Sequence, residues 1–229
     1  MNMTARRVIR GVYAITPEVQ GLWTRQAVLD AVQAALEGGV RLFQCRQKHW
    51  EEEALVEFVA DLADLCMPYS AHLIVNDASA EALSLWPVHG VDGIHLGKDD
   101  EPVDSARQHL PAGLLIGASC YNRFDLAEQA VKKGADYVAF GAVYASGTKP
   151  FAVHAPLNLF EQAAALHVPR VAIGGINLDR IAELRSAGAD AVAVVGGLFG
   201  SADAMPKPLD VLNNARNWVN EFEDWSSTR

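Results

Sequence analysis

Four short glycine-containing turns constrain the fold of this chain more than any other feature of its sequence. Each turn leads directly into an apolar run of strand length, and the turns recur about every fifty residues. They are Glu37-Gly38-Gly39-Val40, His89-Gly90-Val91-Asp92, Lys133-Gly134-Ala135-Asp136 and Ala187-Gly188-Ala189-Asp190. A glycine just past a helix end takes the left-handed conformation that stops the helix. Each turn therefore predicts a helix before it and a strand after it.

Apolar runs and amphipathic stretches alternate along the whole chain. The predicted strands are Val12–Ile15, Leu42–Cys45, Leu73–Val75, Gly93–Leu96, Leu114–Ala118, Tyr137–Val143, Val171–Ile176 and Ala191–Val195. Helical patterns occupy Leu22–Leu36, Glu51–Cys66, Arg123–Lys133, Leu157–Leu166 and Leu178–Ala187. This alternation indicates parallel strands joined by right-handed crossovers.

A unit of two strands and two helices, taken four times, predicts an α/β fold: a single (β/α)8 TIM barrel with parallel strands. We expect one domain over residues 1–229, with its core at about 11–222 and a short polar tail at 223–229. A doubly wound open sheet is the alternative fold. It is disfavoured because no GxGxxG turn follows the first strand.

Charge and cysteine content limit the partners. The formal net charge of −9 argues against nucleic acid and anionic membranes as general partners, so any anion site must be a local cluster of cations. Cys45, Cys66 and Cys120 are widely spaced, which indicates reduced thiols and a cytoplasmic location. No stretch resembles a signal peptide or the ~20 apolar residues of a membrane span. The sequence leaves open whether the chain forms a homo-oligomer.

Polar clusters follow the predicted strands, at the barrel end where active sites form. Gln44, Arg46 and Lys48 alternate along one strand and so face one side, where a guanidinium fork and an ammonium would hold a phosphate. Asp77 and Asp100 follow neighbouring strands, and two carboxylates together with substrate phosphates suit Mg²⁺. Alternatively, the cations form a solvated strand end and each aspartate only caps a helix or shapes a turn.

Glycine pairs follow the last two strands, where many barrels bind a phosphate monoester. These pairs are Gly174-Gly175 and Gly196-Gly197, which could equally be tight turns without a ligand. His95 lies inside a strand and reads as a core histidine. Ser119 is interpreted as a hydroxyl donor to a ligand oxygen, because it does not lie at a GxSxG elbow. The histidines show no HxH or HExxH spacing, so a zinc site is not expected.

These residues form a pattern that resembles the thiamine-phosphate synthase (thiamin-phosphate pyrophosphorylase) family over about residues 11–205. The motifs that carry the resemblance are Gln44-Cys45-Arg46-Gln47-Lys48, Val75-Asn76-Asp77, Asp92-Gly93-Ile94-His95-Leu96-Gly97 with Asp100, Gly117-Ala118-Ser119, Gly141-Ala142-Val143-Tyr144, Ser146-Gly147-Thr148-Lys149, Gly174-Gly175-Ile176 and Gly188-Ala189-Asp190. Each motif alone is weak, but their order at successive strand ends is specific.

The resemblance implies an Mg²⁺-dependent transferase that joins hydroxymethylpyrimidine diphosphate to hydroxyethylthiazole phosphate, giving thiamine phosphate and pyrophosphate. It implies catalytic roles for Arg46, Lys48 and Lys149. The implied pyrimidine diphosphate ligands are Gln44, Cys45, Arg46, Gln47, Lys48, Asn76, Ser119 and Lys149. The implied thiazole phosphate ligands are Ser146, Gly147, Thr148, Gly175, Val195 and Gly196, and the implied metal ligands are Asp77 and Asp100.

Three positions depart from the family pattern: Lys98 replaces a common Gln, Ala145 a frequent Pro and Gly196 a frequent Ser. We expect these changes to tune affinity rather than abolish activity. The alternative functions are a thiazole tautomerase of the same family, a non-catalytic barrel that binds thiamine precursors, and a phosphosugar- or indole-processing barrel. The tautomerase is disfavoured because Cys120-Tyr121-Asn122, and not a histidine, follow Ser119. The loop at Ala145–Val153 is our expected lid.

Overall fold

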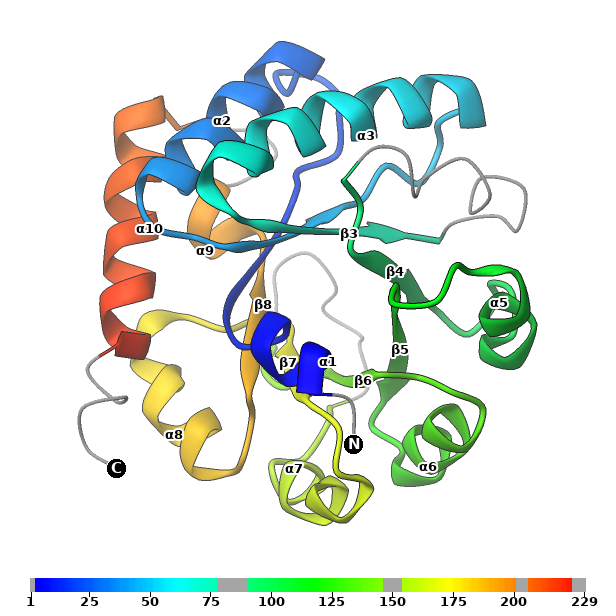
Figure 1. Cartoon of the computed structure of the whole chain (residues 1–229). Helices are drawn as coiled ribbons and strands as arrows, with labels where there is room; N and C mark the ends of the chain where they lie inside the picture. The colour runs from blue at the N-terminus through cyan, green and yellow to red at the C-terminus, as the bar shows by residue number, and fades with distance from the viewer. Residues whose placement is uncertain (1–2, 78–89, 146–153, 201–205, 224–229) are drawn as a thin grey trace.

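Eight parallel strands form a closed barrel in the computed structural model (Figure 1), which describes residues 3–77, 90–145, 154–200 and 206–223. Consecutive strands pair in sequence order, and the last strand pairs with the first. The strands are β1 (Gly11–Ile15), β2 (Leu42–Cys45), β3 (His72–Asn76), β4 (Gly93–Leu96), β5 (Leu115–Tyr121), β6 (Tyr137–Gly141), β7 (Arg170–Ile173) and β8 (Ala191–Val194). The predicted TIM barrel is confirmed.

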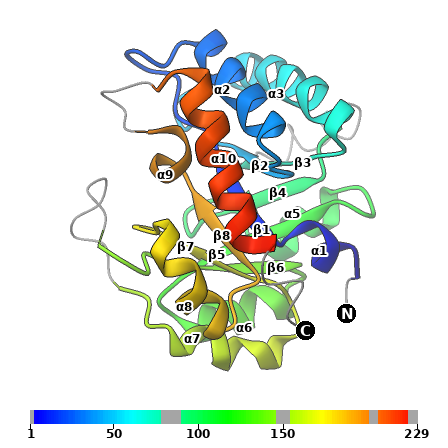
Figure 2. The same cartoon turned by 90° about the vertical axis from the view of Figure 1, so that its left-hand side faces the viewer.

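Helices cover the outside of the barrel. The described helices are α1 (Met3–Val8), α2 (Arg25–Glu37), α3 (Glu52–Cys66), α5 (Val103–His109), α6 (Phe124–Lys132), α7 (Asn158–Gln162), α8 (Ile181–Ser186), α9 (Gly196–Phe199) and α10 (Pro208–Glu223). Short 3-10 turns lie at Met67–Tyr69, Ala163–Leu166 and Leu178–Arg180. Figure 2 shows α10 beside α2, which closes the ring of helices next to β1. None of the helices in the described part of the chain has the length and apolar character that crossing a membrane requires.

Two separate apolar cores follow from the alternation of side chains along the strands. The outer core lies between sheet and helices and includes Phe43 and Cys45 of β2. The inner core fills the barrel and includes Leu42 of the same strand. Helix α1 lies across one end of the barrel in both views (Figures 1 and 2), and its Ala5 and the following Ile9 join the inner core. Residues before Gly11 thus contribute to the inner core.

The repeated turns have a structural cause that extends beyond their glycines. Gly39, Gly134 and Gly188 have φ values of 103°, 106° and 101°, the left-handed geometry expected after a helix. In three turns, an aspartate two residues after the glycine forms two hydrogen bonds with the preceding strand of the barrel. Its carboxylate accepts a backbone N–H from that strand, and its own N–H donates to the carbonyl of the same residue. These pairs are Asp92 with Leu73, Asp136 with Ile116 and Asp190 with Arg170.

Candidate active site at the barrel mouth

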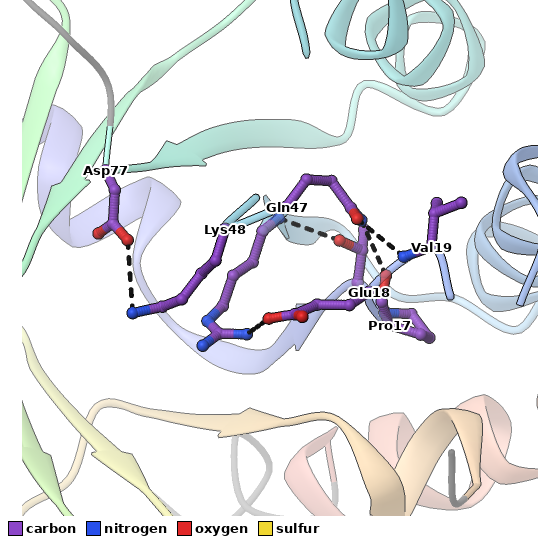
Figure 3. A network of polar contacts seen from close by, with 8 residues as sticks. Pro17, Glu18, Val19, Gln47, Lys48 and Asp77 are labelled. Carbon is purple, nitrogen blue, oxygen red and sulfur yellow. Dashed lines mark hydrogen bonds and ion pairs between the residues drawn. The ribbon is translucent and has the colours of Figure 1, made fainter. Parts of the chain in front are cut away.

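The end of β2 brings two cations to the barrel mouth, as the alternation predicted. Gln44 is buried inside the barrel, and its Nε2 donates to the Tyr13 hydroxyl at 2.9 Å. Beyond it, the Arg46 guanidinium forms an ion pair with Glu18, and Lys48 Nζ lies 3.7 Å from Asp77 Oδ2. Figure 3 shows Lys48 extended toward Asp77. Glu18, whose carboxylate pairs with Arg46, was not among the predicted site residues.

Cys45 and Gln47 alternate with these residues and point away from the mouth. Cys45 is fully buried in the outer core, where desolvation raises the pKa of its thiol. Gln47 accepts the Val19 N–H at 2.8 Å and donates to the Pro17 carbonyl at 2.9 Å (Figure 3). The Gln47 side chain therefore supports the loop after β1.

Two carboxylates meet at the ends of β3 and β4. Asp77 follows β3 in the left-handed conformation (φ 55°), and Asp100 Oδ2 accepts the Gly97 N–H at 2.5 Å. A Cβ added to Gly97 would lie 2.8 Å from Asp100 Oδ2, so the glycine makes room for this carboxylate, and Asp77 Oδ1 would lie at an ordinary contact distance of 4.0 Å. Burial and the adjacent Asp100 raise the pKa of Asp77 to about 6, although Lys48 and Arg46 act in the opposite direction. This electrostatic link also places Arg46 within range of Asp77.

This acid pair fits a hard divalent cation. Two carboxylates that approach each other in a half-buried position repel unless a proton or a cation lies between them. The pKa of Asp77 is raised first by burial and then by the neighbouring Asp100. Mg²⁺ commonly uses one or two carboxylates and takes its other ligands from water and phosphate. Within the ranges that the structure describes, no group of three or more His, Cys, Asp or Glu side chains forms a metal cage. The donor set is therefore of the type that Mg²⁺ shares with a phosphate substrate.

Ser119 ends the inward-facing row of β5, and a histidine lies beside it. His95 Nε2 is 2.9 Å from Ser119 Oγ, and His95 Nδ1 is 3.0 Å from the Tyr137 hydroxyl. Ser119 therefore has a neighbouring histidine, contrary to the prediction, because this partner comes from β4 and not from the residues after Ser119. The prediction of a buried, hydrogen-bonded His95 describes its surroundings correctly. Burial lowers the pKa of His95 to about 4, so the ring is neutral near pH 7.

The backbone of the last two strands turns sharply at the same end of the barrel. Gly174 and Gly175 have φ values of 100° and 64°. A Cβ on Gly175 would meet the Ala145 and Tyr144 carbonyls at 2.5 and 2.6 Å, so only glycine fits there. The turn after β8 is open: Val195 is exposed, and a Cβ on Gly196 would meet no atom within 4 Å. Backbone groups at this turn are accessible to a ligand.

Part of the predicted site lies outside the residues that the structure describes. Asn76 is the last residue of β3 and pairs in register with His95. Ser146, Gly147, Thr148 and Lys149, with most of the expected lid, lie outside the described residues. Besides Glu18, the sequence analysis missed Tyr13 and Tyr137, whose hydroxyls meet inside the barrel at 2.9 Å.

The family model and the curated relatives of this chain agree on one family. Residues 12–198 match the family model described as thiamine monophosphate synthase. The chain is 46% identical to thiamine-phosphate synthase of Chromobacterium violaceum over 195 residues, which cover 85% of this chain and 91% of the relative. It is 45% identical to the Nitrosospira multiformis protein of the same name, covering 86% and 82%. A solved structure of thiamine phosphate pyrophosphorylase from Pyrococcus furiosus superposes with a TM-score of 0.78 at 29% identity, covering 97% and 98%.

Proposed function

Because this chain belongs to the thiamine monophosphate synthase family, we propose that its barrel mouth joins hydroxymethylpyrimidine diphosphate to hydroxyethylthiazole phosphate. The chain is a transferase of thiamine biosynthesis, and its products are thiamine phosphate and pyrophosphate. One observation supports this use of the mouth above all others. Arg46, Lys48, Asp77 and Asp100, which come from three different strand ends, interact electrostatically in one place.

The cations bind the diphosphate and stabilise it as it leaves. In the proposed reaction, the bond between the pyrimidine methylene carbon and the diphosphate oxygen breaks, and the oxygen keeps the electron pair. Arg46 offers a planar fork and Lys48 a point charge to the oxygens on which negative charge grows. We assign the same role to Lys149. The Arg46–Glu18 ion pair holds the guanidinium at the mouth before the substrate arrives.

Asp77 and Asp100 would hold Mg²⁺, which when bound would neutralise negative charge on the diphosphate. The half-buried position of Asp77 and the short Gly97–Asp100 hydrogen bond fix the two carboxylates beside Lys48. Lys98, next to this pair, adds a cation that we expect to shift metal or diphosphate affinity only moderately.

The second substrate needs orientation rather than activation. The aminopyrimidine donates electrons to its methylene carbon, and the thiazole nitrogen supplies the electron pair for the new carbon–nitrogen bond. We assign the thiazole phosphate to Gly175, Val195 and Gly196, with Ser146, Gly147 and Thr148. The exposed turn after β8 supports this assignment, because Gly196 leaves its backbone open to a phosphate. No side chain has to act as a base or a nucleophile.

We infer a cytoplasmic setting and small-molecule substrates. All three cysteines are free and buried, and desolvation raises the pKa of Cys120 to about 12, so these thiols are structural.

The test is a coupled assay of the purified chain with both substrates and Mg²⁺. We expect thiamine phosphate and pyrophosphate in equal amounts and no pyrophosphate when the thiazole phosphate is omitted. Lys48→Ala should lower turnover about a hundredfold. Lys132→Ala removes a matched charge from an exposed i,i+4 ion pair with Glu128 on α6 and should leave turnover unchanged.

The alternatives give different results in the same assay. A tautomerase would release no pyrophosphate, and a sensor would bind both compounds without forming product. Equal loss of activity in the Lys48 and Lys132 variants would refute the assignment of the mouth.

A further inference from the structure

A row of five polar side chains crosses the otherwise apolar interior of the barrel. It runs from Gln44 through Tyr13, Tyr137 and His95 to Ser119, with successive contacts of 2.9, 2.9, 3.0 and 2.9 Å. The first four members are buried, and only Ser119 is partly exposed. We call this row the Gln44–Ser119 chain. It links the buried base of the predicted diphosphate site to a hydroxyl at the mouth.

The absence of a side chain at Gly117 makes room for the Gln44–Ser119 chain. A Cβ added to Gly117 would lie 2.0 Å from Cζ of Tyr137, so the tyrosine ring occupies the space that a side chain would need. The surrounding inner core is apolar, with Ile15 and Leu42 among its members. Buried polar groups in such a core are costly unless every one of them is hydrogen-bonded. The direction of each hydrogen bond is therefore strongly constrained.

The donor at the start of the chain determines that direction. An amide nitrogen only donates, so Gln44 Nε2 uses an electron pair of the Tyr13 oxygen. In the part of the polypeptide that the structure describes, the Tyr13 hydroxyl then has one acceptor, the Tyr137 oxygen. The Tyr137 hydroxyl in turn donates its hydrogen bond to His95 Nδ1. A neutral His95 consequently carries its proton on Nε2 and donates it to Ser119 Oγ.

We propose that the Gln44–Ser119 chain is a one-way series of hydrogen bonds that fixes the Nε2–H tautomer of His95 and keeps the Ser119 proton available for a substrate oxygen. The second half of this statement rests on the proposed function. Tyr13, Tyr137 and His95 are then positioning residues that act through Ser119. In the reversed order, Ser119 would donate to His95 and could only accept from a ligand.

The ionisation of the members agrees with this order. Burial raises the pKa of Tyr13 and Tyr137 and lowers that of His95, so all three are neutral at pH 7. When all its members are neutral, the Gln44–Ser119 chain offers the ligand a hydrogen-bond donor and not a base. A donor is what an oxygen gaining negative charge requires, because the bond strengthens as the charge grows.

The direct test is the tautomer of His95, measured by ¹⁵N NMR of histidine-labelled protein at pH 7. Loss of one signal in His95→Gln assigns the resonance among the seven histidines. We expect the Nε2–H form in the wild type and a mixture of tautomers in Tyr137→Phe. Tyr69→Phe, which removes a hydroxyl that contacts Gln33 on the outside, is the matched control and should leave the tautomer unchanged. A wild-type Nδ1–H tautomer would overturn the proposal.

Kinetics test whether the chain acts through Ser119. The amide of His95→Gln can still donate to Ser119, so this variant should stay within about threefold of wild-type turnover, whereas His95→Leu should lose about tenfold. In a Ser119→Ala background, His95→Leu should have no further effect. Additive losses in folded double variants would contradict the proposal. Failure to form thiamine phosphate in the wild type would refute the proposed function instead, and the tautomer result would still stand.

Discussion

Replacing Asp77 by asparagine is expected to stabilise the metal-free protein while it removes most of its turnover. In the wild type, Asp77 is held close to Asp100 in a half-buried position, and its pKa rises from the ordinary value of 3.8 to about 6. The folded state therefore binds the proton more tightly than the unfolded state does. Wild-type stability falls as pH rises from about 4 to 6, and the loss is complete above that range. Asparagine does not titrate and avoids this loss.

The size of the effect follows from the two pKa values. Each pKa unit is worth ~1.4 kcal/mol, so the difference between 3.8 and about 6 corresponds to at most ~3 kcal/mol. The Asp77 side chain is 27% exposed, and solvent screening reduces the repulsion that the substitution removes. The loss of the contact with Lys48 offsets a further part. We expect a net gain of about 1–2 kcal/mol at pH 8.

Urea unfolding in the presence of EDTA measures this gain. The midpoint of Asp77→Asn should exceed that of the wild type at pH 8 and approach it at pH 4. Asp64→Asn, on the exposed face of α3, is the control for removal of one negative charge from this acidic chain. A variant no more stable than wild type at pH 8, or a gain of equal size at pH 4, would refute the repulsion argument.

Three further predictions concern the barrel itself. Asp136→Ala removes a carboxylate that binds both a β5 amide and Arg107. Urea unfolding should show that the free energy of unfolding falls by about 2–4 kcal/mol, and a fall below ~0.5 kcal/mol would contradict a stabilising role of these bonds. Gly117→Ala places a methyl group against the Tyr137 ring, and calorimetry should show a fall in unfolding free energy of about 3 kcal/mol, whereas an unchanged melting temperature would contradict the packing. The pKa of His95 is about 4 in the folded protein, below its ordinary value of 6.5, so wild-type stability falls as pH falls from about 6.5 to 4. His95→Gln does not titrate, so its stability relative to wild type should rise as pH falls through this range. Parallel pH profiles of the two proteins would refute this.

Local chemistry made much of the architecture predictable. Gly39, Gly134 and Gly188 each follow a helix, as their turns predicted, and the strands after them are parallel. The alternation along β2 placed Gln44 inside the barrel and Cys45 in the outer core, although the resemblance grouped Cys45 with the ligands. Arg46 and Lys48 follow the strand. Helix α1 was missed because six residues are too few to show a helical period.

The interior of the site was not predictable in the same way. Tyr13 and Tyr137 are 124 residues apart in sequence, and each lies within a strand whose other inward residues are apolar. From the sequence alone, a polar residue in such a run is predicted to be an isolated core residue, because its hydrogen-bond partner is not known. His95 shows the consequence, because its environment was predicted correctly but its contact with Ser119 was not. Glu18 was missed for a similar reason: it lies in the loop after β1, and only the fold brings it to Arg46.

The central claim is that acidic and basic side chains from separate strands form one site for a magnesium-bound diphosphate. Calorimetric titration with inorganic pyrophosphate, with and without Mg²⁺, tests it most directly. We expect Mg²⁺ to tighten binding at least about tenfold in the wild type and to have no such effect in Asp77→Asn, which should remain folded. Equal Mg²⁺ enhancement in both proteins would contradict the claim.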